Sequence, residues 1–452
     1  MIIYYEPHDG DPRVGKRSDK LLRMQRILHE HRPDIGHFVD IYKDVHQHPE
    51  LSCLESRTAD VVVRELRNIG FDVTTSIGGH GVIGVLRNGP GKTILTRSEI
   101  DALPIEEKTG LPYASKVRMK SIFGIDQPVM HACGHDIHLA ALLASLRLLY
   151  SAKGEWSGTV IGVFQPNEEM SGGARAMVDD GLYGRHGCPV PDLMLAQHVG
   201  MSKAGLVAVR TGPVLAASDF IELEIFSKGI GPNPPECRDP VSLASYLITR
   251  FQSIISSDVS INGEYKRTTL KCRDFKAGVP GVSFTNKVYI RLELKTTETS
   301  DRDNIFSVIK TITKAECEAS SGKRIEASVR LTPRAPITRN DTKSAEALQE
   351  CFGRHFGDRF WIPPMDAPVE DFANLSGPKP VPFVYWKLGS TDPAKWDEGV
   401  RKGGDILLHL PTNHSPEFAP APELTIVTGM EAMSLATLWF LDGDDSQDAP
   451  FV

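Results

Sequence analysis

Five side chains that can bind a metal ion lie within nine residues of the sequence, at positions 130–138. They are His131, Cys133, His135, Asp136 and His138. Cys133 and His135 are the leading candidates, because the single glycine between them favours a tight loop in which both side chains reach one ion. A thiolate and a neutral imidazole suit zinc, cobalt, nickel or manganese. The alternative interpretation is a histidine-rich helix start with ordinary capping.

Further donors follow apolar runs that have the character of strands. Glu168 and Glu169 follow the run at 159–164 after three intervening residues, and His198 follows the run at 193–196. In open α/β sheets, ligand sites gather beyond the carboxyl ends of the strands. The predicted donor set is Cys133, His135, Glu168, Glu169, His198 and His414. Mixed sulfur, nitrogen and oxygen donors can hold two divalent ions, with one donor bridging them.

The adjacent carboxylates have different predicted tasks. Side chains of neighbouring residues on extended backbone point opposite ways, and Pro166 with the glycine pair at 172–173 indicates a turn. One carboxylate can then bind metal while the other takes a proton from a metal-bound water that attacks a carbonyl. The alternative for the pair is a solvated helix N-terminus. His198 and His414, each taken alone, are equally compatible with core or surface positions.

Composition describes a soluble globular protein and excludes several classes of partner. The chain has 452 residues, 40% hydrophobic and 24% charged, which allows two or three domains. A net charge of -7 does not suggest nucleic-acid binding. Seven cysteines at irregular spacing do not form a disulfide framework. We find no apolar run near 18 residues and no apolar leader, so we expect no membrane partner and a cytoplasmic location.

Helical and strand patterns alternate along most of the chain, which predicts an α/β fold with a sheet flanked by helices. This catalytic domain is expected in two parts, residues 34–214 and 332–442. Between them, residues 215–331 predict a β-α-β-β-α-β insertion, with four antiparallel strands and two helices on one face. Residues 1–33 are expected to form an N-terminal extension, and residues 443–452 an acidic tail.

With these motifs the chain resembles the M20 metallopeptidases, in the amidohydrolase branch of hippurate hydrolases and plant hydrolases of indole-acetyl amino acids. The resemblance covers roughly residues 36–441. The motifs that carry it are, in chain order, residues 46–52, 101–104, 130–138, 164–169, 172–174, 197–199, 370–372 and 414–418.

The resemblance implies a metallopeptidase-type mixed sheet with an inserted ferredoxin-like domain that serves as a lid and dimerisation surface. It also implies two divalent ions, of manganese, zinc, nickel or cobalt. Their ligands would be Cys133, His135, Glu169, His198 and His414. Glu168 matches the general base, and Asp101 matches a carboxylate that orients a ligand. Asp136 and His138 are expected to brace the loop. Family members cleave the amide of an N-acyl amino acid, so a small amide substrate and a homodimer are expected.

The insertion departs from the family pattern. Members carry a Gly-Gly-His-x-x-x-Pro segment whose histidine stabilises the oxyanion, but the corresponding residues 227–235 contain no histidine. Losing one oxyanion donor costs about 100- to 1,000-fold in rate. Asn233 is the nearby polar side chain, Asn286 belongs to a shortened Asn-Val-Ile-Pro segment, and Lys295 stands where arginine is expected. Asn233 and Asn286 are therefore candidate substrate-binding residues.

A specialised metal-dependent amidohydrolase is the function that these observations predict. Two alternatives use the same metal site. One is an amide-forming or acyl-transfer enzyme of secondary metabolism, in which the altered lid excludes water. The other is a protein that retains metal and binds a ligand without hydrolysing it.

Overall fold

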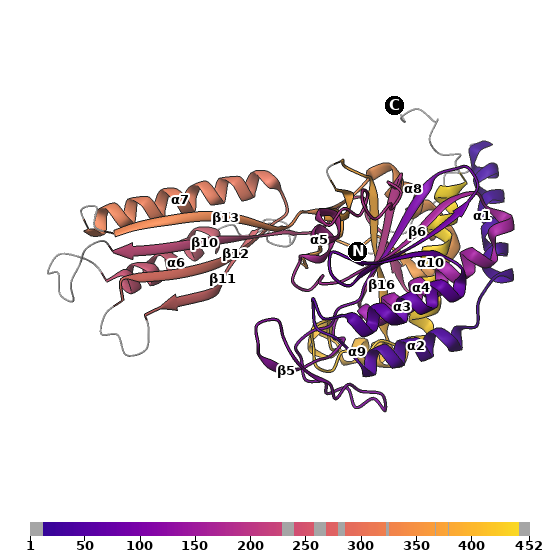
Figure 1. The fold of residues 1–452 in the computed structure, drawn as a ribbon, viewed down its shortest axis with the longest axis horizontal. Coiled ribbons are helices and arrows are strands. Elements are labelled where there is room, and N and C mark those ends of the chain that lie inside the picture. Colours follow the sequence, from indigo (N-terminus) through magenta and orange to yellow (C-terminus); the bar gives the residue numbers. More distant parts are fainter. Residues whose placement is uncertain are drawn as a thin grey trace. The chain divides into compact units, whose positions relative to one another are not determined.

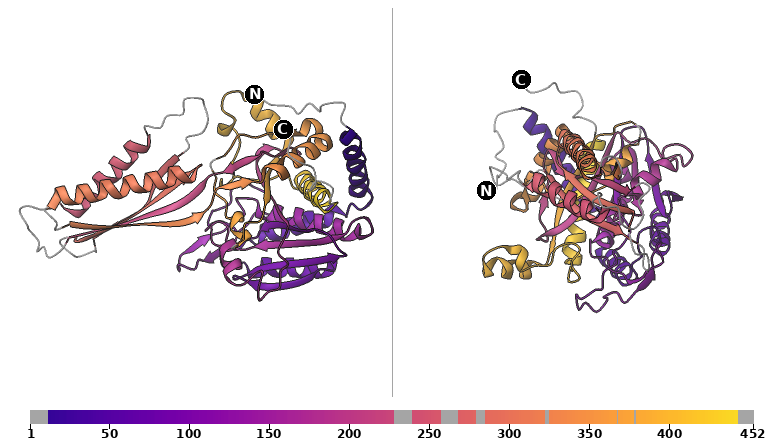
Figure 2. Two further views of the ribbon diagram at one scale, coloured as in Figure 1. Left: turned by 90° about the horizontal axis from the view of Figure 1, so that it is seen from above. Right: turned by 90° about the vertical axis from the view of Figure 1, so that its left-hand side faces the viewer.

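The computed structural model describes residues 12–227, 239–256, 268–278, 285–321, 325–366, 368–377 and 379–442. The chain divides into two compact units, whose helices and strands are drawn in Figures 1 and 2. The second unit comprises Pro213–Thr338 and Met365–Ala373. The first unit comprises the chain up to Gly212, Arg339–Pro364, and the chain from Asn374 onward.

A mixed sheet forms the centre of the first unit (Figure 1). Within the described residues its order is β1-β2-β6-β3-β7-β16-β8-β15. The strands are β1 (Asp72–Ile77), β2 (Gly81–Asn88), β3 (Thr93–Glu99), β6 (Gly158–Gln165), β7 (Leu193–Lys203), β8 (Val207–Ala208), β15 (Phe360–Trp361) and β16 (Phe383–Thr391). The run β6-β3-β7-β16 is parallel, whereas β1, β2 and β8 pair with their neighbours β2, β6 and β16 in antiparallel fashion. Strands β2, β3 and β6 are buried almost throughout, as expected for strands with both faces covered.

Helices cover this sheet with the apolar stripes that the sequence spacing marks. They are α1 (Pro12–Glu30), α2 (Ile35–Gln47), α3 (Ser56–Ile69), α4 (His135–Ser151), α5 (Gly173–Asp179), α8 (Thr342–Phe356), α9 (Pro393–Lys402) and α10 (Pro422–Leu441). Helices α4 and α10 pack against each other and against β3 and β7. Helix α3 buries Val62 and Leu66 beside β1 and β2. Helix α1 buries Met24 and Ile27 and contacts α10, so this part of the expected N-terminal extension belongs to the core.

Helix α10 corrects the expectation that no stretch of the sequence has the length and apolarity of a membrane span. Among the described residues, only α10 meets both criteria, with a mean hydropathy of 1.5. However, 83% of that window is buried inside the protein. A helix that is apolar on all sides is also what the centre of a large soluble domain requires. We therefore interpret α10 as a core helix.

The second unit is a four-stranded antiparallel sheet with two helices. Its elements are β10 (Ala217–Ser227), α6 (Pro240–Ser256), β11 (Thr268–Ala277), β12 (Lys287–Thr296), α7 (Thr299–Ser321) and β13 (Ile325–Ala335). The order is β11-β12-β10-β13, and the pairs are antiparallel. Helices α6 and α7 pack side by side on one face of the sheet (Figure 2). Ile221, Leu223 and Ile225 point into this interface and are fully buried.

The predicted fold class is confirmed: a mixed sheet flanked by helices, with a β-α-β-β-α-β insertion. Several short elements were not predicted. These are the hairpin strands β4 (Arg118–Lys120) and β5 (Asp126–Pro128), strands β9 (Gly212–Leu215) and β14 (Thr338–Asn340), and 3₁₀ turns at Lys153–Glu155, Gly357–Arg359, Phe372–Ser376 and Ile406–Leu408. Helix α9 was also missed, although Asp392 caps it by accepting the backbone N–H groups of Ala394 and Lys395.

One carboxyl group in the second unit makes stability depend on pH. Asp219, in β10, is buried, and its Oδ2 has no hydrogen-bond partner among the described residues. Burial raises the pKa of Asp219 to about 6, although the charge of Arg302 opposes the shift. Because the folded carboxyl holds its proton more tightly than the unfolded one, its stabilising contribution is full below about pH 4. That contribution is lost as the pH rises through about 6.

We therefore expect Asp219→Asn to stabilise the protein at pH 7.5 by about 1 kcal/mol after solvent screening. The amide has no charge to desolvate, so the gain should be absent near pH 4. Melting temperatures of the wild type and the variant at both pH values measure this difference. Asp72→Asn serves as the control, since the Asp72 side chain is 85% exposed. A gain of equal size at both pH values would contradict the explanation.

Candidate metal centre

The predicted donors come from separate segments of the first unit that meet at one edge of the sheet. Asp101 follows the end of β3, and Glu168 and Glu169 follow the end of β6. His198 lies within β7, and Cys133 and His135 stand at the start of α4. The remaining donor, His414, lies in the loop that precedes α10. Strands β6, β3 and β7 are parallel neighbours, so their carboxyl ends deliver these side chains to one place.

Gly134 allows Cys133 and His135 to share this place. It precedes the first residue of α4 and has φ +84°, in the left-handed region that favours glycine. A Cβ at this position would lie 2.5 Å from Cγ2 of Val199 in β7. The turn therefore brings the start of α4 directly against the strand that carries His198. Only glycine fits both the backbone conformation and the space.

Distances between the donor atoms match those of groups that share a metal ion. The Cys133 Sγ is 3.2 Å from Nε2 of His414 and 3.5 Å from Nε2 of His198. Glu169 is 3.6 Å from Nε2 of His414 and 3.8 Å from Nε2 of His135. Ligand atoms about 2.0–2.3 Å from a common ion lie roughly 3 to 4 Å from one another. The site thus brings together all five predicted ligands, with Cys133 in contact range of two histidines.

Two buried atoms in the cluster have no hydrogen-bond partner among the described residues. They are Nε2 of His135 and Oε1 of Glu169. Buried polar atoms are normally paired, so an orphaned nitrogen and an orphaned oxygen that face each other at 3.8 Å require an explanation. A cation between them would satisfy both. The residues present therefore fit a divalent ion.

Protonation of the ligands reflects an excess of negative charge in a buried space. Burial, together with the charges of Glu169 and Glu168, raises the pKa of Cys133 well above its usual value. Burial raises the pKa of Glu169 to about 7. Burial alone would lower the pKa of His135, but hydrogen bonding to Asp101 and the charge of Glu99 raise it to about 10. A bound cation would displace these protons, because metal ligands bind in their deprotonated form.

Hydrogen bonds orient the rings of His135 and His198 so that Nε2 of each faces the other donors. His135 donates Nδ1–H to the backbone oxygen of Asp101 at 2.8 Å. His198 donates Nδ1–H to the backbone oxygen of Val199 at 2.7 Å. In the neutral form of each ring the proton therefore resides on Nδ1, and Nε2 then has a lone pair for a metal.

Asp101 occupies the position predicted for it, behind the ligands. Its Oδ2 accepts the Ser52 hydroxyl at 2.7 Å and the backbone N–H of Glu169 at 3.0 Å. Its Oδ1 lies 3.2 Å from Nδ1 of His135. One carboxylate therefore touches two predicted ligands and restrains both.

Glu55, which the sequence analysis did not single out, holds the turn that carries Glu168 and Glu169. Asn167 has φ +55°, and its backbone N–H donates to Oε1 of Glu55 at 2.8 Å. The same oxygen accepts the backbone N–H of Cys53 at 2.8 Å. Both carboxylates lie near Nε2 of His135, with Glu168 at 3.9 Å and Glu169 at 3.8 Å. Glu169 alone of the two also lies close to His414, at 3.6 Å.

Asn413 is a second residue that sequence reasoning missed. Its side-chain amide donates to the backbone oxygens of Cys133 at 3.1 Å and Val199 at 3.2 Å. It thereby ties the loop that bears His414, whose φ is +69°, to the segments that carry Cys133 and His198. Its position next to His414 was the only available signal.

The substrate-binding candidates, Asn286 and Asn233, come from the insertion and not from the chain segments that carry this cluster. Asn286 lies in the second unit with an exposed side chain, and its backbone oxygen accepts the N–H of Ser227 at 2.9 Å. Asn233 lies outside the described residues, as does the rest of the 228–235 stretch that lacks a histidine. Lys295, in β12, pairs across the sheet with Ser218 and Thr269.

Comparisons with known proteins find relatives over most of the chain. The model of peptidase family M20/M25/M40 matches residues 95–403. A hippurate hydrolase of Campylobacter jejuni is 32% identical over 334 residues, which cover 72% of this chain and 80% of the relative. An N-acetylcysteine deacetylase of Bacillus subtilis is 28% identical over 84% of this chain and 95% of its own length. The structure of a dinuclear metal-binding M20 peptidase from Bacillus subtilis has a TM-score of 0.70 at 24% identity, covering 90% of this chain and 98% of that one.

Proposed function

Since the chain belongs to peptidase family M20, in its amidohydrolase branch, we propose that it hydrolyses the amide bond of a small N-acyl amino acid or a related carboxylate-bearing amide. The names of its relatives support the substrate class, because hippurate and N-acetylcysteine are both N-acyl amino acids. The observation that carries the proposal is the convergence of one thiol, three imidazoles and one carboxylate within about one ligand shell.

We assign two divalent ions to this centre. Cys133, His135, Glu169, His198 and His414 would hold them. When bound, the ions would polarise the substrate carbonyl and acidify a water molecule. The candidate ions are manganese, zinc, nickel and cobalt, since each accepts nitrogen and sulfur donors.

Glu168 is assigned as the general base. Its carboxylate accepts the proton of the attacking water and then returns it to the departing amine as the carbon–nitrogen bond breaks. Burial of Glu168 supports this task, because a base shielded from bulk solvent acts only on molecules held in the site. Asp101 keeps the neighbouring Glu169 and His135 in place, so that Glu168 has a fixed distance to the metal centre.

Removal of metal provides the direct test. We expect chelation to abolish hydrolysis of N-benzoylglycine and N-acetylcysteine, and we expect one of the four divalent ions to restore it, measured as amine release. Chelated protein that retains full activity would refute the proposal. Formation of amide from free acid and amine, without hydrolysis, would instead favour the acyl-transfer alternative. Metal uptake without either reaction would favour a binding protein.

The altered insertion suggests a narrow substrate range. The absence of histidine from residues 227–235 removes the side chain expected to stabilise the oxyanion in the family. We therefore propose a specialised pocket rather than general activity, and a panel of N-acyl amino acids that differ in both halves tests it. Comparable rates across the panel would contradict this specialisation.

Two further properties are proposals that follow from the sequence. A reducing, cytoplasmic compartment would keep Cys133 available as a ligand, and cell fractionation would test this location. A homodimer through the second unit is proposed from the family resemblance. The molecular mass of the protein in solution would distinguish a dimer from a monomer.

A further inference from the structure

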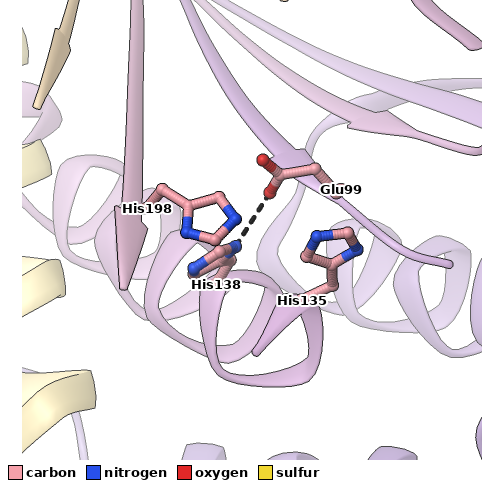
Figure 3. Close-up of side chains that lie close together, drawn as sticks. All are labelled: Glu99, His135, His138 and His198. Carbon is pink, nitrogen blue, oxygen red and sulfur yellow. Dashed lines mark hydrogen bonds and ion pairs between the residues drawn. The ribbon is translucent and has the colours of Figure 1, made fainter. Parts of the chain in front are cut away.

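The side chains of His135, His138 and His198 lie around the carboxylate of Glu99 (Figure 3). His198 is half-buried, and the other three side chains are buried. One ligating atom from each lies within 4.8 Å of the others, as in a cation site. Their hydrogen bonds indicate a different role. Both ring nitrogens of His138 have partners: Nδ1 is 2.9 Å from Oε2 of Glu99, and Nε2 accepts the backbone N–H of Val199 at 2.8 Å. His138 therefore has no lone pair left for a metal ion.

The bond from Val199 determines which nitrogen of His138 carries the proton. A backbone N–H can only donate, so Nε2 of His138 must be the acceptor. The remaining proton resides on Nδ1 and is donated to Glu99. His138 is thus a neutral ring in a defined tautomer, held between a carboxylate and a backbone amide.

Glu99 is itself held by a buried partner. The guanidinium of Arg97 pairs with Oε1 of Glu99, and its Nε donates to Oε1 of Gln165 at 2.9 Å. Arg97, Glu99 and His138 are each at most 2% exposed. Buried charges require such complete pairing. The chain of contacts from Gln165 to Val199 therefore joins β6, β3, α4 and β7, which are the elements that carry the predicted ligands.

Val199 transmits this restraint to a metal ligand. Its N–H is bound by His138, and its backbone oxygen accepts Nδ1–H of His198 at 2.7 Å. The rings of His138 and His198 also pack against each other, with centroids 4.4 Å apart (Figure 3). The orientation that directs Nε2 of His198 toward Cys133 thus depends on His138 through both the backbone and the ring.

We propose that His138, held by Glu99 and Arg97, is a positioning residue that fixes His198 for metal binding through the Val199 peptide. The inference rests on the metal centre assigned above. It states that His138 is required for tight binding of the ion that His198 ligates, and that it is not itself a ligand. Groups behind metal ligands typically contribute about 10- to 100-fold to metal affinity.

Two substitutions of His138 separate this role from general packing. In His138→Gln the side-chain amide reaches the position of Nε2 and can still accept the N–H of Val199. In His138→Asn the shorter amide reaches only the position of Nδ1 and keeps the contact with Glu99. We expect His138→Asn to lower the affinity for one of the two ions by about 10- to 100-fold and to leave the affinity for the other unchanged. We expect the metal affinities of His138→Gln to stay closer to those of the wild type.

The measurement is a titration of the metal-free full-length protein with Co²⁺ alone, followed by metal analysis of each saturated sample. Ser145→Ala is the matched control. Ser145 lies on the same helix as His138, and the substitution removes its buried hydrogen bond with Ser434. It should lower thermal stability without changing either Co²⁺ affinity. Unchanged affinities in His138→Asn, or equal weakening of both ions in the two His138 variants, would overturn the proposal. A wild type that binds no Co²⁺ would refute the metal centre itself.

Discussion

Replacing Glu168 by glutamine is expected to reduce kcat by about 10²- to 10⁴-fold while leaving both metal ions bound. The amide has the size of the carboxylate but cannot accept the proton of the attacking water. Glu168 is buried beside His135 and Glu169 but lies outside the group of Cys133, Glu169 and His414. A glutamine of the same size should therefore leave the proposed ligands in place. Steady-state kinetics on the metal-loaded variant, with metal analysis of the same sample, measure both quantities.

Glu169→Gln is the matched comparison, because the two residues are adjacent and differ in their assigned tasks. Glu169 faces His135 and His414, so we expect its amide variant to lose metal affinity as well as activity. Both variants should therefore lose turnover, but only Glu169→Gln should lose metal. Glu168→Gln with turnover within about 10-fold of the wild type would exclude Glu168 as the base.

Cys133→Ser is expected to weaken binding of both ions by at least about 100-fold, the upper range found for residues that merely support a ligand. Its sulfur lies within 3.5 Å of Nε2 of both His198 and His414, so the substitution removes the donor that two other proposed ligands contact. A serine hydroxyl stays protonated and is a poor substitute for a thiolate. Metal analysis and the loss of the thiolate absorption of the Co²⁺ form measure the effect.

Cys188→Ser is the control for this experiment. Cys188 is also a buried free cysteine, but its sulfur donates to the backbone oxygen of Pro189 and it is not one of the predicted ligands. We expect this variant to bind both ions as the wild type does. Unchanged metal content and affinity in Cys133→Ser would show that the Cys133 sulfur is not a metal ligand.

The fold was predictable where periodic patterns are long. The helical spacing of residues 34–70 with its break at Pro49, and the alternation at 220–226, correspond to α2, α3 and β10. Strands β4 and β5 were missed because each has only three residues and both carry charges, which gives too short a pattern to recognise. Helix α10 was misjudged because its polar residues interrupt the apolar run while most of its surface is still buried.

The donors of the site were predictable from residue type and chain order, but their supports were not. Cys133, His135 and Glu169 stand beside glycines and strand ends, which are visible in the sequence. Glu55 and Asn413 act through hydrogen bonds that span 112 and 280 residues, respectively. No local pattern encodes such a bond, because it exists only after the sheet has assembled.

The discontinuous first unit has a consequence for how the protein acquires its metal during synthesis. Cys133 and His135 leave the ribosome long before His414, because the whole insertion and a further catalytic segment are translated in between. A growing chain therefore lacks one of the proposed metal ligands until His414 has been translated. In the proposed metal centre, an ion that needs His414 can bind only after the later segment of the first unit has been synthesised.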